Sequence, residues 1–189
     1  SRLFTAKRCA QCHAVGGRGG SVGPPLDAFK RLKSPILLAA IMWNHGPLMA
    51  SKMEGGKIDW PIFRGTELVD LVTYIVSAAR GEGGESVLVV PGIPDRGEKL
   101  FAERGCATCH PVGPTREGST APRLAAQAQR VGPTEVAGLM WNHGARMWAT
   151  MSARGLAGPR LTGSEMADIA AYLFTAYYLD SPTGRAPRG

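Results

Sequence analysis

Two pentapeptides of the form Cys-x-x-Cys-His constrain this sequence more than any other feature. They read Cys-Ala-Gln-Cys-His at residues 9–13 and Cys-Ala-Thr-Cys-His at residues 106–110, and together they use all four cysteines. This spacing is the attachment signal for a c-type haem. Two thiols one turn apart can reach the two vinyl groups of a porphyrin, and the adjacent imidazole then falls beneath the iron.

Zinc sites and redox dithiols also contain Cys-x-x-Cys. However, zinc sites seldom take two thiolates and the adjoining histidine together, and here the histidine follows both copies. The motifs therefore predict two covalently bound haem c groups. The predicted attachment residues are Cys9, Cys12, Cys106 and Cys109, and the predicted proximal iron ligands are His13 and His110.

The two motifs are halves of a repeat that runs through the chain. Met-Trp-Asn-His-Gly at residues 42–46 recurs at residues 140–144, and the segment 66–71 is matched by 164–169. Self-similarity at one period indicates duplicated units, and two copies are too few for a solenoid. We therefore predict tandem domains. The predicted boundaries are 1–80 for the first domain, 81–95 for a linker, 96–180 for the second domain and 181–189 for a loose tail.

The sequence pattern predicts an all-helical structure with long loops. Ser34-Pro35 is an N-cap followed by proline at the first helical position. It opens a helix that reaches His45, where Gly46-Pro47 predicts a break or a kink. Thr162 to Glu165 has the capping-box pattern. The other expected helices are 3–12, 98–109, 133–154 and a last helix that ends near Tyr178.

An early aromatic helix, a Cys-x-x-Cys-His motif, a loop rich in glycine and proline, a middle helix and a closing helix with tyrosine follow one another in both halves. This order resembles the class I cytochrome c domain over nearly the whole chain. The resemblance implies an all-α fold of two tandem class I cytochrome c-like helical domains, each enclosing one covalent haem. It also implies that the first and last helices of each domain cross, with Phe4 against Tyr74 and Phe101 against Tyr172.

The resemblance further implies side chains that surround each haem. Pro24 and Pro122 match the proline whose carbonyl accepts a hydrogen bond from the proximal imidazole, which fixes the ring and raises its basicity. Repeated tryptophan and asparagine side chains are expected to bond the haem propionates, with a buried tryptophan and a helix-capping asparagine as the structural alternative. These four residues are Trp43, Asn44, Trp141 and Asn142.

The distal iron ligand has three candidates in each half. They are spaced by four residues and share one helical face, and adjacent candidates are about 6 Å apart along a helix, so only one can reach each iron. The family usually supplies a methionine before the last helix, which makes Met53 and Met151 the first choice. The second choice is Met49 and Met147, and the third is a bis-histidine site through His45 and His143.

The formal net charge is +7, and most of it lies in the first half. Such an imbalance steers association with acidic proteins, and Lys30, Arg31 and Lys33 are the predicted docking residues. No basic cluster is interleaved with aromatic residues, so we expect no nucleic-acid partner. We expect an electron-transfer protein, either a carrier or a respiratory-complex subunit, that is not an enzyme and turns over no small-molecule substrate. The alternative is a dihaem enzyme of the peroxidase or sulfur-compound oxidase type, with one open iron.

No apolar stretch reaches the length of a membrane span, and no signal peptide is visible. Covalent haem attachment takes place outside the cytoplasm. We therefore expect a periplasmic or otherwise extracytoplasmic protein from which a targeting segment or an anchor has been removed. Association with a membrane complex stays an open alternative.

Overall fold

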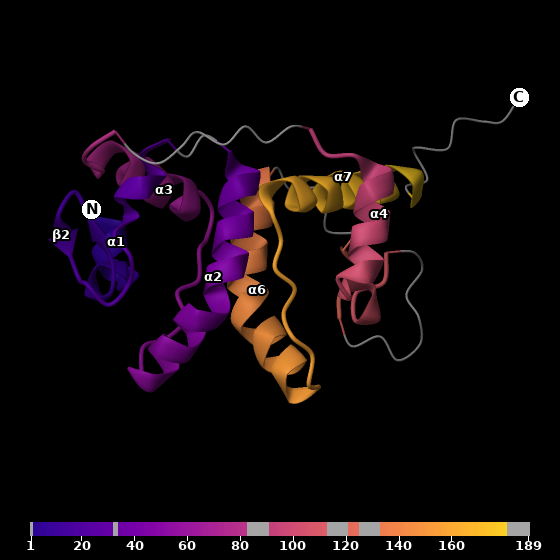
Figure 1. Ribbon diagram of the computed structural model, residues 1–189, viewed down its shortest axis with the longest axis horizontal. Helices are drawn as coiled ribbons and strands as arrows, with labels where there is room; N and C mark the ends of the chain where they lie inside the picture. Colours follow the sequence, from indigo (N-terminus) through magenta and orange to yellow (C-terminus); the bar gives the residue numbers. More distant parts are fainter. Residues whose placement is uncertain (1, 32–33, 83–90, 113–120, 125–132, 181–189) are drawn as a thin grey trace, which may run out of the picture.

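The computed structural model is built almost entirely of helices, which confirms the predicted all-α class. Two long helices, α2 (Pro35–Gly55) and α6 (Pro133–Ala153), lie side by side at the centre of the molecule, and their far ends diverge (Figure 1). The helices α1 (Arg2–Ala6) and α3 (Glu67–Ala78) lie on one side of this pair, and α4 (Pro94–Glu103) and α7 (Gly163–Asp180) lie on the other. The described residues are 2–31, 34–82, 91–112, 121–124 and 133–180.

Each Cys-x-x-Cys-His motif begins in a short 3-10 turn, η1 (Cys9–Gln11) in the first repeat and η3 (Cys106–Thr108) in the second. The residue before each turn is left-handed, with φ of 61° at Arg8 and 77° at Gly105. A left-handed residue ends a helix, so the prediction of one continuous helix over each motif is wrong. After the first motif the chain forms a small hairpin, β1 (Ala14–Val15) with β2 (Arg18–Gly19), and the turn η2 (Leu26–Arg31).

The helix α2 begins as predicted, because the hydroxyl of Ser34 accepts a hydrogen bond from the Leu37 N–H at 3.2 Å. It does not break at Gly46-Pro47 but continues to Gly55. Proline inside a helix removes one helical hydrogen bond, and α2 packs along α6 with Pro47 in place. Gly46 serves this packing, since a Cβ atom there would overlap the ring of Trp148.

The predicted crossing of first and last helices is present in both repeats. The ring centroids of Phe4 and Tyr74 are 5.7 Å apart, and those of Phe101 and Tyr172 are 5.8 Å apart. Both phenylalanines are almost fully buried. Aromatic pairs at this separation stabilise a fold beyond their buried area, so each crossing fixes the helix that leads into a Cys-x-x-Cys-His motif.

The predicted capping box of the last helix is also confirmed. The Thr162 hydroxyl accepts a hydrogen bond from the Glu165 N–H at 3.2 Å, and the Glu165 carboxylate accepts one from the Thr162 N–H at 2.8 Å. Glu165 also forms an ion pair with Arg104 at the end of α4. In the first repeat, Glu67 pairs in the same way with Lys7 at 2.7 Å.

The two repeats exchange polar contacts across the central helix pair. The indole N–H of Trp43 on α2 donates to the carbonyl of Pro159, which lies between α6 and α7, at 2.7 Å. The side-chain amide of Asn44 donates to the Leu161 carbonyl at 2.6 Å and accepts from the Leu161 N–H at 2.9 Å. The loop that follows the long helix of the second repeat is therefore held by the long helix of the first.

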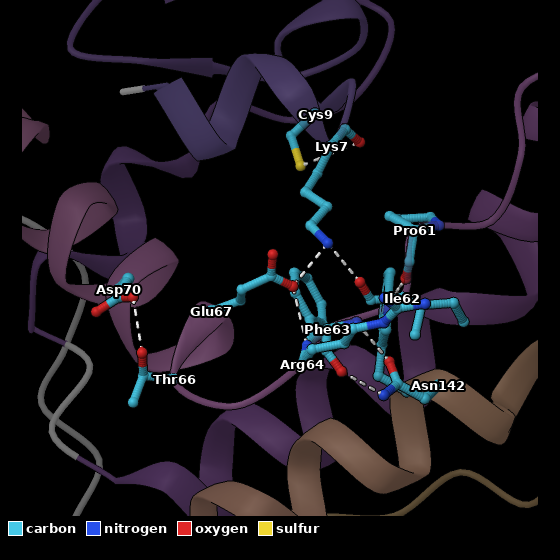
Figure 2. A network of polar contacts seen from close by, with 11 residues as sticks. Lys7, Cys9, Pro61, Ile62, Phe63, Arg64, Thr66, Glu67, Asp70 and Asn142 are labelled. Atoms are coloured by element: carbon cyan, nitrogen blue, oxygen red, sulfur yellow. Dashed lines mark hydrogen bonds and ion pairs between the residues drawn. The ribbon is translucent and has the colours of Figure 1, made fainter.

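The reverse contacts follow the same pattern. The indole of Trp141 donates to the Pro61 carbonyl at 2.7 Å, and Asn142 exchanges two hydrogen bonds with the backbone of Phe63 (Figure 2). The exchange gives the repeats an internal two-fold relationship, and it ties each repeat to the other through main-chain groups.

Tryptophan side chains fill the space between the long helices. Trp60 stacks on Trp141 with centroids 4.2 Å apart, and Trp148 contacts both Trp60 and Trp43 at 5.5 Å. Trp60 and Trp148 have no tryptophan at the equivalent position of the other repeat, where Gly158 and Ala50 stand. Among the described residues, the buried indole N–H of Trp148 has no hydrogen-bond acceptor.

The second repeat begins two residues before the predicted boundary at 96, because α4 starts at Pro94. Most of the predicted linker (83–90) and the predicted tail (181–189) lie outside the described residues. None of the helices in the described ranges combines the length and the apolar character that a membrane crossing requires.

Candidate haem-binding sites

Each proximal histidine is buried and held by a proline carbonyl. His13 Nδ1 lies 2.8 Å from the carbonyl oxygen of Pro24, and His110 Nδ1 lies 3.1 Å from that of Pro122. A carbonyl can only accept, so Nδ1 carries the proton and donates it. The lone pair of Nε2 is therefore left free to bind a metal, and the ring orientation is fixed.

The local fold of the motif places the cysteines and the histidine together. The Cys9 carbonyl accepts hydrogen bonds from the N–H groups of Cys12 and His13 at 3.2 and 2.9 Å. The second motif repeats both bonds, at the same distances, onto the Cys106 carbonyl. One tight turn thus presents two thiols and one imidazole to the same side of the chain.

In each motif, the first thiol lies in an environment that disfavours the thiolate. Burial raises the pKa of Cys9 to about 11, and burial also raises the pKa of Cys106. A reactive dithiol needs a lowered thiol pKa, so the environment disfavours that chemistry. All four cysteines are free of disulfide bonds, and each pair is available to the vinyl groups of one porphyrin.

In the first repeat, the imidazole of His45 on α2 faces that of His13. The two ring centroids are 6.1 Å apart, with an angle of 59° between the planes. A bond from a metal to an imidazole nitrogen is about 2 Å long. Two imidazoles that bind one metal from opposite sides have their centroids about 6 Å apart, and the separation of the His13 and His45 rings is compatible with such an arrangement.

In the second repeat, His143 lies within electrostatic range of the proximal histidine, His110. Burial lowers the pKa of His143, and the nearby charges of His110 and then Arg146 lower it further. His45 in the first repeat behaves alike, since burial and then the charge of His13 lower its pKa. Burial and a neighbouring imidazole therefore disfavour the charged form of both His45 and His143.

The methionine candidates lie further along the same helices. Met53 is eight residues after His45, which corresponds to about 12 Å along α2. It is buried, whereas Met151 is half-buried and lies beside Gly158. Met53 and His45 are therefore too far apart to bind the same iron, so they are alternative ligands. Met49 and Met147, one turn beyond the histidines, pack against the hydrophobic core.

The expectation that tryptophan and asparagine bond the propionates needs correction. An indole has one donor, and Trp43 and Trp141 each use it on a proline carbonyl of the other repeat. Asn44 and Asn142 use both ends of the side chain on peptide groups of the other repeat. These four residues join the repeats, and their polar side-chain groups already have hydrogen-bond partners in the backbone of the other repeat.

The sequence contains the donors and acceptors of these hydrogen bonds at matched positions, but their pairing can be recognised only once the fold is known. The acceptor positions recur at the same offset as the donors, with Pro61 matched by Pro159 and Phe63 matched by Leu161. Nothing in one repeat alone indicates that its donors reach the loop of the other. The residues of the two motifs therefore fit a haem c in each repeat, and in the first repeat His45 lies beside His13. The tryptophan and asparagine pairs belong to the interface.

Comparison with protein families gives a match to the family model described as Cytochrome c, at residues 1–79 and again at residues 94–176. The two segments cover most of the chain and coincide with the two repeats. Comparisons with curated proteins and with solved structures gave no match.

Proposed function

The chain belongs to the cytochrome c family, and from that premise we propose that it is a dihaem electron-transfer protein in which two histidines close the coordination of each iron. The family supports haem-based electron transfer. When bound, each haem supplies one-electron exchange between ferric and ferrous iron. The observation that carries the proposal is the separation of 6.1 Å between the rings of His13 and His45.

The two motifs would hold one haem c each. In the first repeat, Cys9 and Cys12 would form the thioether bonds, and His13 and His45 would be the iron ligands. In the second repeat, the same roles fall to Cys106, Cys109, His110 and His143. The carbonyls of Pro24 and Pro122 keep the proximal rings in place, because each accepts the Nδ1–H of its histidine.

A closed iron favours transfer over catalysis. A peroxidase or an oxidase needs one iron with an open or weakly held position, and such an enzyme normally differs between its two haem sites. Here a second imidazole lies near each proximal histidine, and the sites repeat in their proximal bonds and their aromatic crossings. These features support a carrier, or the electron-transfer subunit of a larger complex, without turnover of a small molecule.

Histidine in place of methionine as the distal ligand has a consequence for the potentials. A thioether favours ferrous iron relative to a second imidazole. We therefore propose that both haems titrate at lower potential than they would with Met53 and Met151 as ligands. Partners that donate to this protein must be correspondingly stronger reductants.

Acidic redox proteins are the proposed partners, and the first repeat is the proposed docking face. The side chains of Arg31 and Lys33 lie outside the described residues, and Lys30 donates to the Gly81 carbonyl at 2.6 Å. Arg2, Arg8 and Arg18 are exposed around the first motif. These three arginines present the positive charge that an acidic protein would meet. An extracytoplasmic site of action agrees with covalent haem attachment in this family.

The test is the ligand set of the oxidised protein. Electron paramagnetic resonance should show two low-spin bis-histidine haems, and the far-red sulfur-to-iron band should be absent. His45→Ala and His143→Ala should each open one iron, so that carbon monoxide binds one haem. The matched variants Met53→Ala and Met151→Ala should leave both spectra unchanged. A sulfur-to-iron band in the wild type that disappears in Met53→Ala would return the assignment to methionine, and carbon monoxide binding to the wild type would support the enzyme.

A further inference from the structure

The two long helices carry different charges near the haem sites. Arg146 follows His143 by three residues, and Arg154 follows the last residue of α6. The equivalent positions of the first repeat hold Leu48 and Gly56. The second repeat therefore has a positive charge at two positions, one on α6 and one directly after it, where the first repeat has uncharged residues.

Both arginines lie close to groups that contact the second haem. The guanidinium of Arg154 donates from Nη1 to the sulfur of Cys109 at 3.5 Å. In the proposed haem protein, that sulfur is the thioether that joins the chain to the porphyrin, so Arg154 lies at the porphyrin edge. Arg146 is one turn from His143, and residues three apart on a helix are neighbours on its surface.

A fixed positive charge changes the redox equilibrium of a nearby iron in a definite direction. Reduction adds one electron to the haem, so a neighbouring cation stabilises the reduced form more than the oxidised form. Both arginines are exposed, and solvent and salt therefore screen part of the effect. The direction of the shift is unaffected by screening.

We propose that Arg146 and Arg154 raise the reduction potential of the second haem, so that they set the preference of that haem for the electron. The inference rests on the proposed binding of a haem c at residues 106–110. It concerns the effect of each arginine on the haem beside it. The exposed Arg8 precedes the first motif, where Gly105 precedes the second. Any effect of Arg8 on the potential of the first haem leaves the inference about the second haem unchanged.

The experiment is a spectroelectrochemical titration of the full chain with both haems bound. The variants Arg146→Leu and Arg154→Gly introduce the residues of the first repeat. At a fixed ambient potential within the transition of the second haem, each variant should lower the ratio of reduced to oxidised haem several-fold. The double variant should approach a tenfold change, which is a shift of about 59 mV for a one-electron couple. High salt should reduce the change, and the transition of the first haem should stay in place.

Three controls make the outcome specific. A background with Cys9→Ala and Cys12→Ala retains only the second haem and assigns its transition. Arg146→Lys and Arg154→Lys keep the charge and should keep the potential of the second haem close to that of the wild type. Arg146→Gln and Arg154→Gln remove the charge with less change in side-chain size, so they should lower that potential even if the leucine and glycine variants disturb haem binding. Leu48→Arg places a cation at the exposed equivalent position on α2, and it should raise the potential of the first haem.

The inference is overturned if the neutral variants retain two low-spin haems and shift neither transition, or shift both equally. It is also overturned if the lysine variants lower the potential as much as the glutamine variants, because that result assigns the effect to shape and not to charge. A wild-type protein that never holds a second haem would overturn the proposed function, and this inference with it.

Discussion

The side-chain amide of Asn142 binds the backbone of Phe63 in the other repeat at both ends. Its Nδ2 donates to the Phe63 carbonyl at 2.7 Å, and its Oδ1 accepts from the Phe63 N–H at 2.8 Å (Figure 2). Asn44 makes the corresponding pair of bonds to Leu161. Each asparagine thus satisfies both backbone groups of a single residue in the opposite loop, as a neighbouring strand would, and ties the two repeats together.

Replacing either asparagine should therefore destabilise the whole molecule. Asn142→Ala and Asn44→Ala each remove two hydrogen bonds and leave two half-buried backbone groups without partners, which costs about 2–3 kcal/mol of unfolding free energy. Denaturant unfolding, followed at the haem absorbance and by far-ultraviolet dichroism, measures the loss. Ser77→Ala removes one local bond from an exposed helix surface and should cost much less. A variant that loses only a few tenths of a kcal/mol would show that the exchange is not structurally important.

The close approach of α2 to Trp148 means that two opposite effects on stability compete when Gly46 is replaced by alanine. Glycine inside an exposed helix costs about 1 kcal/mol relative to alanine, so Gly46→Ala would be stabilising if propensity decided the outcome. A Cβ atom at residue 46 would overlap the Trp148 ring, and one at Gly144 would lie 2.6 Å from it. Overpacking of this kind costs about 1–3 kcal/mol, so both variants should unfold more easily than the wild type.

Gly55→Ala is the matched control, because a Cβ atom there meets no other atom within 4 Å. It should leave the stability unchanged or raise it slightly. The double variant with Gly46→Ala and Trp148→Leu should recover part of the loss, since the smaller side chain removes the overlap. An unfolding midpoint for Gly46→Ala at or above that of wild type would contradict the close packing.

The two ion pairs at the starts of α3 and α7 predict an acid-sensitive part of the stability. The hydrogen bond from Lys7, followed by the one from the Arg64 N–H, lowers the pKa of Glu67 (Figure 2). The Thr162 N–H, and then Arg104, lower that of Glu165. A carboxyl group whose pKa falls on folding stabilises the folded state above its ordinary pKa. This stabilisation is lost as the pH falls below about 4.5 and through the folded pKa.

Glu67→Gln and Glu165→Gln should therefore lower the thermal midpoint at pH 7 and have little effect at pH 3. The measurement is the difference in midpoint between variant and wild type at each pH. Glu54→Gln, on an exposed part of α2, should show a small difference that does not depend on pH. Equal differences at both pH values for the two test variants would show that the charge is not responsible.

Much of the fold and the proximal site can be predicted from local sequence patterns. The N-cap at Ser34, the capping box at Thr162 and the crossing of Phe4 with Tyr74 each depend on a few neighbouring residues or on one matched pair. Each has a short-range physical cause, and each is present. The local signal for a break at Gly46-Pro47 is not followed, because α2 continues to Gly55 and packs with Gly46 against the Trp148 ring.

The roles of the tryptophan, asparagine and distal residues could not be predicted in the same way. Trp43 and Asn44 are ordinary candidates for a cofactor contact until the loop of the other repeat is placed beside them. The order of the distal candidates depends on which turn of α2 faces His13, and periodicity alone allows His45, Met49 or Met53. The position of each candidate relative to His13 depends on the register of that helix, and the ring of His45 lies 6.1 Å from that of His13, which is why we propose His45.

The hydrogen bonds between the repeats predict that loss of one haem affects the stability of the other repeat. We expect the second haem to pack against α6, so its loss should weaken the contacts that α6 makes to Pro61 and Phe63. Cys106→Ala with Cys109→Ala should then increase backbone hydrogen exchange at residues 61–66 of the first repeat. A coupling of about 1–3 kcal/mol between two sites corresponds to a change of roughly 5- to 150-fold. The reciprocal pair, Cys9→Ala with Cys12→Ala, should increase exchange at residues 159–162. If the first repeat kept its full protection in the absence of the second haem, the two halves would be independent domains that merely touch.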